Sequence, residues 1–189
     1  MIARNQDADS LLARMNKSPR REQPIVSESM TDVKSNVPRI FLVVVDDSEE
    51  MHKALLFASL RAKRTGGKVA MLYVQQPADF QHWLGVGEIM REEAREEGEV
   101  LMQELSSEAH RLSDSFPIVY IREGDTAEEL FALLEEEKSI SVVVLAASPD
   151  SQGADPIIAS ITGKRKSEVR VPFTIVPGNL SDEEVRAIS

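Results

Sequence analysis

The chain contains no cysteine among its 189 residues. This absence excludes disulfide bonds, a thiol nucleophile and every metal site that needs a thiolate ligand, and it suits a reducing compartment. Long hydrophobic runs are also missing: no run approaches the roughly 20 residues of a membrane-spanning helix, and none resembles the core of a secretory signal. We therefore expect a cytoplasmic protein that does not enter a membrane.

The chain also has fewer basic than acidic residues. The chain has 32 acidic and 22 basic residues, which gives a formal net charge of −10. Such a surface repels phosphate backbones and favours solubility. The basic clusters Arg20–Arg21 and Lys164–Lys166 are too short to reverse this. Nucleic acid is therefore not expected as a general partner.

The motifs that mark catalytic centres are absent from the sequence. His52, His82 and His110 lie far apart, and no serine or aspartate stands in a nucleophile elbow. Gly163-Lys164 lacks both the upstream glycine and the following hydroxyl residue of a phosphate-binding Walker motif. The glutamate-rich runs at 92–99 and 135–137 are typical of solvated helix faces. We expect a protein with no enzyme activity, no catalytic residue and no metal site.

The composition divides the chain into three parts. Residues 1–37 are polar with isolated apolar positions, which predicts a disordered tail; Met30 is a plausible alternative start, in which case residues 1–29 are not native. Residues 38–178 have the composition of one domain. Residues 179–189 form a short C-terminal tail whose capping pattern predicts a short, loose helix.

Within the domain, buried strands alternate with helices. Apolar and β-branched runs predict five strands, at residues 39–45, 68–74, 117–121, 141–147 and 171–177. Helical patterns lie between them: one starts at Ser48 and stops at Gly66, and others cover residues 88–113, 126–137 and 157–166. This alternation predicts an α/β fold, with a single parallel sheet, right-handed crossovers and helices on both faces.

Sheets of this kind bind ligands at the carboxyl ends of their central strands. Asp46 and Asp47 end the first predicted strand, Val74 ends the second, and residues 146–150 leave the fourth. Paired acids after a first strand are also found in response-regulator receiver domains, where they hold magnesium. Those domains need an aspartate at the end of the third strand and a lysine at the end of the fifth, and this sequence has Ile121-Arg122 and Val176-Pro177 there. The receiver hypothesis fails at both places.

A different resemblance extends over the whole domain. "IFLVVVDDSEEMHKALLFA" resembles the opening strand, turn and helix of universal stress proteins, and "KVAMLYV" resembles their second strand. "REGDTAEEL" is similar to their turn into the third helix, and "VVVLAAS" and "VPFTIVPG" to their last two strands. The pieces follow one another in the family's order and spacing from Pro38 to Pro177.

The resemblance implies a doubly wound five-stranded parallel sheet of order 3-2-1-4-5, of the adenine nucleotide alpha hydrolase-like type. It also implies a homodimer formed through the fifth strand, Val171–Pro177. One branch of the family binds ATP through an aspartate after the first strand and the backbone after the second. Asp46 and Val74 match these positions, and Ser160 matches the hydroxyl residue of the family's phosphate loop. A plainer interpretation of Asp46 is that it caps the following helix.

The phosphate loop itself departs from the family pattern. That pattern reads Gly-x2-Gly-x9-Gly-Ser/Thr, and this chain has Ala146, Pro149, Ala159 and Ser160 at the same spacing. Such loops hold phosphate with backbone N–H groups that glycine allows to come close, and proline has no N–H to donate. We therefore expect a non-enzymatic, dimeric stress-response or regulatory protein with weak or no ATP binding and no other cofactor. The alternative is an ATP-binding stress-response switch that uses Asp46 and the loop after the fourth strand.

Overall fold

The structure, a computed structural model, describes residues 38–76, 86–148 and 156–189, with only the backbone at 86–90. The chain divides into two units, residues 1–34 and 35–189, and every described residue belongs to the second unit. The predicted tail, the alternative start at Met30, His82 and Pro149 lie outside the described residues.

Five parallel strands form one sheet. They are β1 (Ile40–Val45), β2 (Lys68–Gln75), β3 (Ile118–Glu123), β4 (Ile140–Ala147) and β5 (Phe173–Pro177), and their order across the sheet is β3-β2-β1-β4-β5. The predicted fold class and strand order are therefore confirmed. The direction of the winding reverses between β1 and β4, so the carboxyl end of β1 lies at the topological switch point, where such sheets bind ligands.

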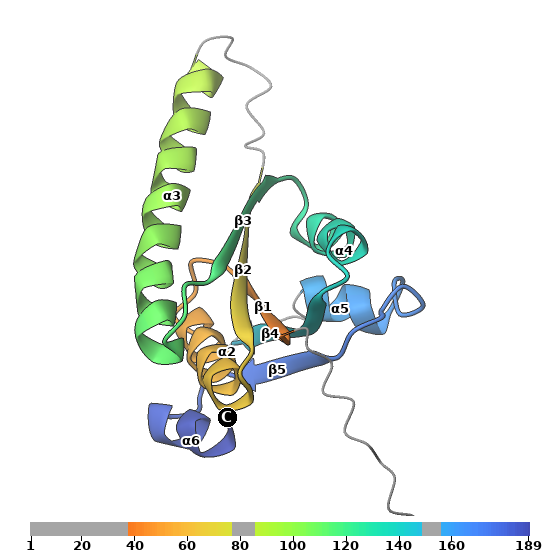
Figure 1. Ribbon diagram of the computed structural model, residues 1–189. Helices are drawn as coiled ribbons and strands as arrows, with labels where there is room; N and C mark the ends of the chain where they lie inside the picture. The colour runs from red at the N-terminus through yellow and green to blue at the C-terminus, as the bar shows by residue number, and fades with distance from the viewer. Residues whose placement is uncertain (1–37, 77–85, 149–155) are drawn as a thin grey trace, which may run out of the picture. The chain divides into compact units, whose positions relative to one another are not determined.

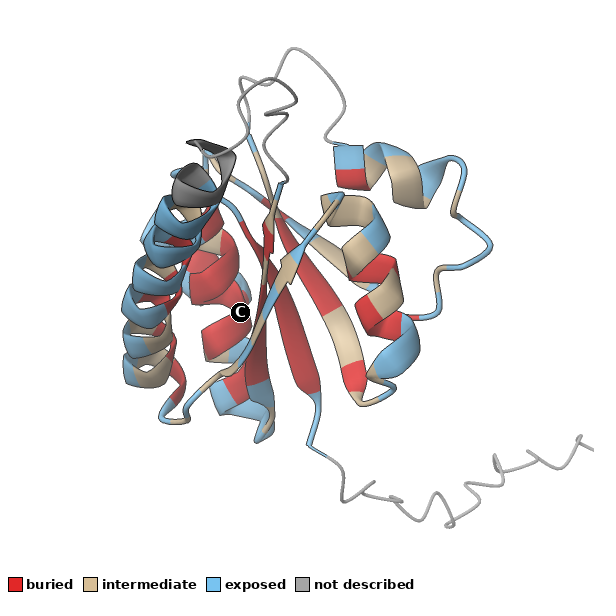
Figure 2. Ribbon diagram, turned by 90° about the horizontal axis from the view of Figure 1, so that it is seen from above, coloured by how far each residue is buried: buried red, intermediate tan, exposed pale blue. Residues whose placement is uncertain are grey.

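Helices cover both faces of this sheet (Figures 1 and 2). One face carries α2 (Met51–Thr65), α3 (Val86–Ser113) and α6 (Asp182–Ile188), and the other carries α4 (Thr126–Glu136) and α5 (Pro156–Thr162). All six residues of β1 are buried and alternate between the two hydrophobic layers. A strand buried on both faces needs a continuous apolar run, and "IFLVVV" supplies it.

Local sequence explains most helix boundaries. α2 ends at Gly66, whose φ of 67° is the left-handed conformation that glycine adopts without strain. α4 begins after Asp125, whose side chain accepts a hydrogen bond from the Glu128 backbone N–H at 3.0 Å. Asp125 is therefore the N-cap of α4.

Two boundaries differ from the sequence prediction. α2 begins at Met51, so Glu49 and Glu50 precede its first turn instead of forming it. α5 ends at Thr162 and not at residue 166, because the chain turns there: the backbone N–H of Arg165 donates to the Ser160 carbonyl at 3.0 Å. The turn places the Arg165 guanidinium over the Phe131 ring, 5.0 Å from its centroid.

The C-terminal helix is packed more firmly than its sequence predicts. Ser181 and Glu184 form a complete capping box at its start, Val185 is fully buried in the α2–α3 layer, and Lys53 of α2 forms an ion pair with Asp182. The prediction of a helix is confirmed, and its description as loose is wrong. Short helices gain most of their stability from such packing.

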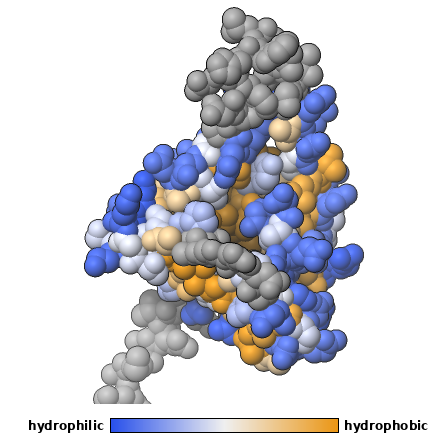
Figure 3. Space-filling view, turned by 180° about the vertical axis from the view of Figure 1, so that it is seen from behind, coloured by the Kyte–Doolittle hydropathy of each residue, from blue (hydrophilic) through white to orange (hydrophobic). Residues whose placement is uncertain are grey.

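The surface is dominated by polar side chains. Figure 3, which shows the molecule from behind, has hydrophobic surface in separate areas between hydrophilic ones. Over residues 38–76, 86–148 and 156–189, no helix has both the length and the apolar character that crossing a bilayer requires.

Candidate functional site

The turn after β1 is held by the Asp46 carboxylate. Its Oδ1 accepts hydrogen bonds from the Ser48 backbone N–H at 3.0 Å and from the Ser48 hydroxyl at 2.6 Å. The Ser48 hydroxyl in turn accepts from the Met51 backbone N–H at 3.3 Å. Asp46 therefore holds the turn before α2 but does not cap the helix, because the N-cap of α2 is Glu50 and no side chain caps it. Asp46 stays exposed, so its second oxygen is accessible to a ligand.

A cavity of about 530 Å³ opens beside this turn. It lies at the carboxyl ends of β1 and β2 and is closed on one side by α3, with these described lining residues: Val45, Asp46, Asp47, Tyr73, Val74, Gln76, Glu97, Gly98 and Leu101. Asp46 and Val74, the two residues that the sequence placed in an adenine site, thus line the same cavity.

The wall formed by α3 depends on a close approach of two residues. Gly98 is buried against the Tyr73 ring, and a β-carbon at this position would lie 2.5 Å from Tyr73 Cε1. The end of β2 is joined to α3 a second time by the Gln75 side-chain amide, which donates to the Arg91 carbonyl at 3.3 Å. Neither Tyr73 nor Gly98 was predictable from the sequence as part of the site, because the contact between them joins residues far apart in the chain.

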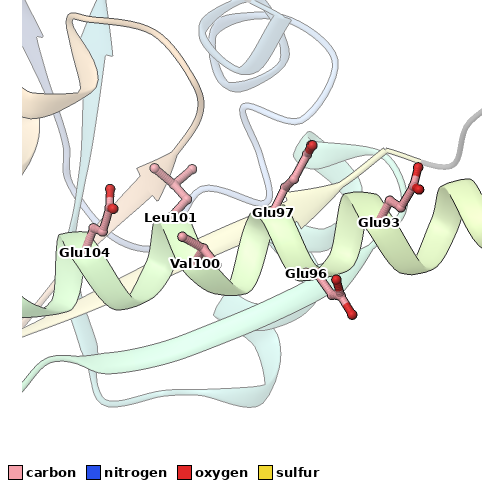
Figure 4. Close-up of a pocket in the computed structure, with 6 residues that line it drawn as sticks. All are labelled: Glu93, Glu96, Glu97, Val100, Leu101 and Glu104. Carbon is pink, nitrogen blue, oxygen red and sulfur yellow. The ribbon is translucent and has the colours of Figure 1, made fainter.

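A second hollow of about 480 Å³ continues along α3 and shares Glu97 and Leu101 with the first. Figure 4 shows the six described residues that line it: Glu93, Glu96, Glu97, Val100, Leu101 and Glu104. Carboxylates therefore surround both hollows, and no lysine or arginine is among their described lining residues. This electrostatic environment disfavours anionic ligands.

The β4 side of the switch point also carries a carboxylate. Glu50, the residue before α2, accepts a hydrogen bond from the Ser148 side chain just after β4. That bond is the largest cause that lowers the pKa of Glu50, followed by the backbone N–H of Glu50 itself. Gly178 lies close by, since a β-carbon there would be 2.1 Å from Glu50 Cγ.

Ser160 stands apart from the other two predicted site residues. It lies half-buried on α5, which covers the opposite face of the sheet from α3. It is not among the described lining residues of the cavity that contains Asp46 and Val74. Ala146 is the last residue but one of β4, and Ala159 lies on α5, while Pro149 falls outside the described residues. Among the described residues, no group of three side chains is arranged to hold a metal ion.

Known structures share this fold at low sequence identity. The universal stress protein UspA from Lactobacillus plantarum is 17% identical with a TM-score of 0.59, over 73% of this chain and 97% of that one. A member of the universal stress protein family from Burkholderia pseudomallei is 22% identical with a TM-score of 0.59, over 75% and 98%. A universal stress protein in complex with cAMP is 15% identical with a TM-score of 0.50, over 75% and 98%.

The sequence comparison agrees with the structural one. No curated protein matches the chain, but the model of the universal stress protein family matches residues 38–177. That match begins just before β1 and ends with β5, so it contains the whole sheet and both hollows, and excludes α6. The chain belongs to the universal stress protein family.

Proposed function

We propose that this protein is a non-enzymatic stress-response or regulatory protein that acts as a homodimer. In this proposal, the cavity at the carboxyl ends of β1 and β2 receives an adenine nucleoside, and ATP binds weakly or not at all. The observation that carries the proposal is the cavity itself, which combines Asp46 and Val74 with an acidic rim.

The size and position of the cavity support a small-molecule ligand. Its volume of about 530 Å³ falls within the range of roughly 300–1,000 Å³ that is usual for such sites. Tyr73 and Leu101 offer apolar contacts to a flat ring, and the Asp46 and Gln76 side chains offer hydrogen-bonding groups. A structural neighbour, a universal stress protein solved in complex with cAMP, supports the proposal that an adenine compound is the ligand.

The phosphate side supports the weak binding of ATP. The family's loop glycines are replaced by Ala146, Pro149 and Ala159. Proline removes one N–H donor, and the two alanines add β-carbons that keep a phosphate away from the neighbouring backbone N–H groups. Each lost charge-assisted hydrogen bond forfeits about 1.5–3 kcal/mol. Losing two of them weakens binding by more than roughly a hundredfold.

The absence of a catalytic pair within the described residues supports a non-enzymatic role. His52 Nδ1 lies 3.2 Å from Glu108 Oε2, between α2 and α3, and the His110 ring stacks on Phe116, 4.0 Å between centroids. Neither histidine is among the residues that line the two hollows. No described lining residue is a serine or a threonine that a base could activate.

Mass spectrometry of the small molecules that co-purify with the protein, followed by titration calorimetry with ATP and with adenosine, tests the proposal. We expect little bound ATP and a dissociation constant for ATP above roughly 100 μM, equivalent to about −5.5 kcal/mol, with measurable binding of adenosine. Binding of ATP at low micromolar concentration would instead identify the ATP-dependent switch.

A further inference from the structure

β3 is the edge strand of the sheet on the side opposite to β5 (Figure 1). Within the described residues it pairs only with β2. Every second residue of such a strand directs its backbone N–H and C=O groups away from the sheet. Proteins usually protect a free edge with charged side chains or with a covering element, so the side chains along β3 show whether this edge is protected or available.

Apolar side chains remain exposed on one face of β3. Val119 and Ile121 pair with residues of β2 whose side chains lie in the α2–α3 layer, and therefore point to the same face. α3 packs on α2 and β2 and leaves these two side chains 41% and 43% exposed. The row extends to Phe116, which is 75% exposed and stacks on His110 of α3. This face of the strand is therefore apolar and accessible.

The opposite face of β3 is polar and carries excess negative charge. The Arg122 guanidinium is shared by the carboxylates of Glu129 and Glu136 on α4. Tyr120 packs partly against the α4–α5 layer, and burial, followed by the nearby Glu137 carboxylate, raises the pKa of its hydroxyl. Three carboxylates and one guanidinium thus lie beside an aromatic ring, a setting that favours a cation.

We propose that β3 is a docking edge for an extended segment of a partner protein in which apolar residues alternate with lysine or arginine. Such a segment adds to the sheet as a sixth strand, with main-chain hydrogen bonds to β3. Its apolar side chains lie beside Val119 and Ile121, and its basic side chains lie beside Tyr120 and the neighbouring carboxylates. The inference goes beyond the proposed function, because it needs neither the adenine site nor the homodimer.

Charge separates this occupant from a second copy of the chain. Antiparallel pairing of two β3 strands about a two-fold axis would keep the α4 side of both copies on the same face of the joined sheet. The glutamates of the two copies would then approach one another across the new interface, and like charges so placed destabilise a strand pair. A basic segment neutralises the same carboxylates instead.

The test uses a synthetic peptide, Lys-Val-Lys-Ile-Arg-Val-Lys, with blocked ends and a fluorescein label, and measures its binding to the full-length protein by fluorescence anisotropy. We expect a dissociation constant below roughly 100 μM, which rises with salt concentration. One control peptide, Val-Val-Ile-Lys-Lys-Arg-Lys, has the same composition without the alternation. A second control replaces every basic residue of the probe with glutamate. Neither control should bind at the same concentrations.

Two variants locate the apolar contact, after circular dichroism has confirmed the fold of each. Ile121→Lys places a charge in the exposed row and should weaken binding of the alternating peptide at least tenfold. Ile175→Lys is the matched control, because it makes the same change at a residue of nearly equal exposure, 42%, on the opposite edge of the sheet. It should change the affinity by less than threefold.

The charge contact has its own pair of variants. The double exchange Glu136→Gln and Glu137→Gln removes two carboxylates beside β3 and should weaken binding at least threefold. Glu135→Gln removes one carboxylate of the same run, but that group forms ion pairs with Lys138 and Arg170. It should change the affinity by less than twofold.

Three results would overturn the inference. One is no binding of the alternating peptide at concentrations up to about 1 mM. Another is equal binding of the peptide without alternation, which would reduce the effect to general attraction between opposite charges. The third is unchanged binding in Ile121→Lys, or an equal loss in Ile175→Lys, which would place the peptide elsewhere than β3.

Discussion

Gly178 and the Glu50 side chain share one narrow space after the last strand. A methyl group at residue 178 would overlap Glu50 Cγ and lie 3.1 Å from the Ala147 carbonyl oxygen. Overpacking of this kind usually costs about 1–3 kcal/mol. We expect Gly178→Ala to lower the free energy of unfolding by an amount in this range, as measured by urea denaturation.

A double-mutant cycle separates the two contacts of that methyl group. Glu50→Ala removes the side chain that the new methyl group would meet but leaves the Ala147 carbonyl in place. We expect the pair Gly178→Ala and Glu50→Ala to lose less stability than the sum of the two single variants. Strictly additive losses would show that Glu50 does not occupy the space beside Gly178.

The neighbouring aspartates after β1 should differ in their effect on stability. Asp46 holds the turn through two hydrogen bonds with Ser48, whereas Asp47 has none with another described residue. An intramolecular hydrogen bond contributes about 0.5–1.5 kcal/mol to stability. We expect a loss of that size for Asp46→Ala and a change within about 0.5 kcal/mol for Asp47→Ala, both from thermal unfolding. Equal effects would contradict this role of Asp46.

Residues were predictable from the sequence where their role depends on near neighbours. The turn that Asp46 holds through Ser48 follows from its place between a buried strand and a helix. The positions of Glu50 and Tyr73 were not predictable, because each depends on a glycine distant in the chain, Gly178 and Gly98, that leaves room for the side chain. A single glycine in a sequence does not show which distant side chain approaches it.

At the scale of elements, continuous patterns were reliable and short ones were not. The continuous apolar run of β1 predicted that strand, and Gly66 predicted the end of α2. α6 has only seven residues and one buried side chain, Val185, so its sequence shows a capping box but not the surface that receives it. That surface is provided by α2, which lies far from α6 in the sequence.

The packing of α6 predicts a difference between two of its apolar residues. Val185 is fully buried and Ile188 is 57% exposed. Removal of buried methyl groups costs the lost burial and leaves a cavity, so we expect Val185→Ala to lower the free energy of unfolding by about 1–3 kcal/mol. Ile188→Ala is the control, with an expected change within about 0.5 kcal/mol. Equal effects would show that α6 is loose in solution.

The start of α6 should also loosen in acid. The Lys53 ammonium lowers the pKa of Asp182, and hydrogen bonds from the Ser181 backbone N–H and hydroxyl lower that of Glu184. A group with a lowered folded-state pKa contributes stability above its unfolded pKa and loses it as pH falls through the folded value. Protection of the Val185 amide against hydrogen exchange should therefore decrease below about pH 4.5. In Ser181→Ala the decrease should be smaller, and an identical decrease would contradict the capping role.

At the scale of the whole molecule, the carboxyl end of the sheet and its edge at β5 have surfaces of different chemical character. The carboxyl end collects negative charge, from Asp46 and Asp47 in the turn to the glutamates along α3. The sheet edge at β5 instead exposes an apolar side chain, Ile175, which is 42% exposed. Within the described residues β5 pairs only with β4, so its other edge offers backbone groups to a further strand.

A free apolar edge of this kind favours pairing with a second copy of the chain. An uncovered strand edge invites further strands, and a two-fold interface satisfies both edges at once and closes the assembly. Pro172 precedes β5 and Pro177 is its last residue, which limits how far pairing can extend. Phe173 packs partly against the core, so Ile175 is the better residue for a test that leaves the fold intact.

If the protein forms the proposed homodimer, we expect Ile175→Asp to be monomeric in sedimentation velocity experiments at micromolar concentration. Two carboxylates facing each other across a two-fold interface would repel, and their burial would carry a large desolvation cost. Ile188→Asp provides the control, because it places the same charge at an exposed apolar residue on α6 and should leave the dimer unchanged. A wild type that sediments as a monomer at this concentration, or an Ile175→Asp variant that remains dimeric, would rule out assembly through β5.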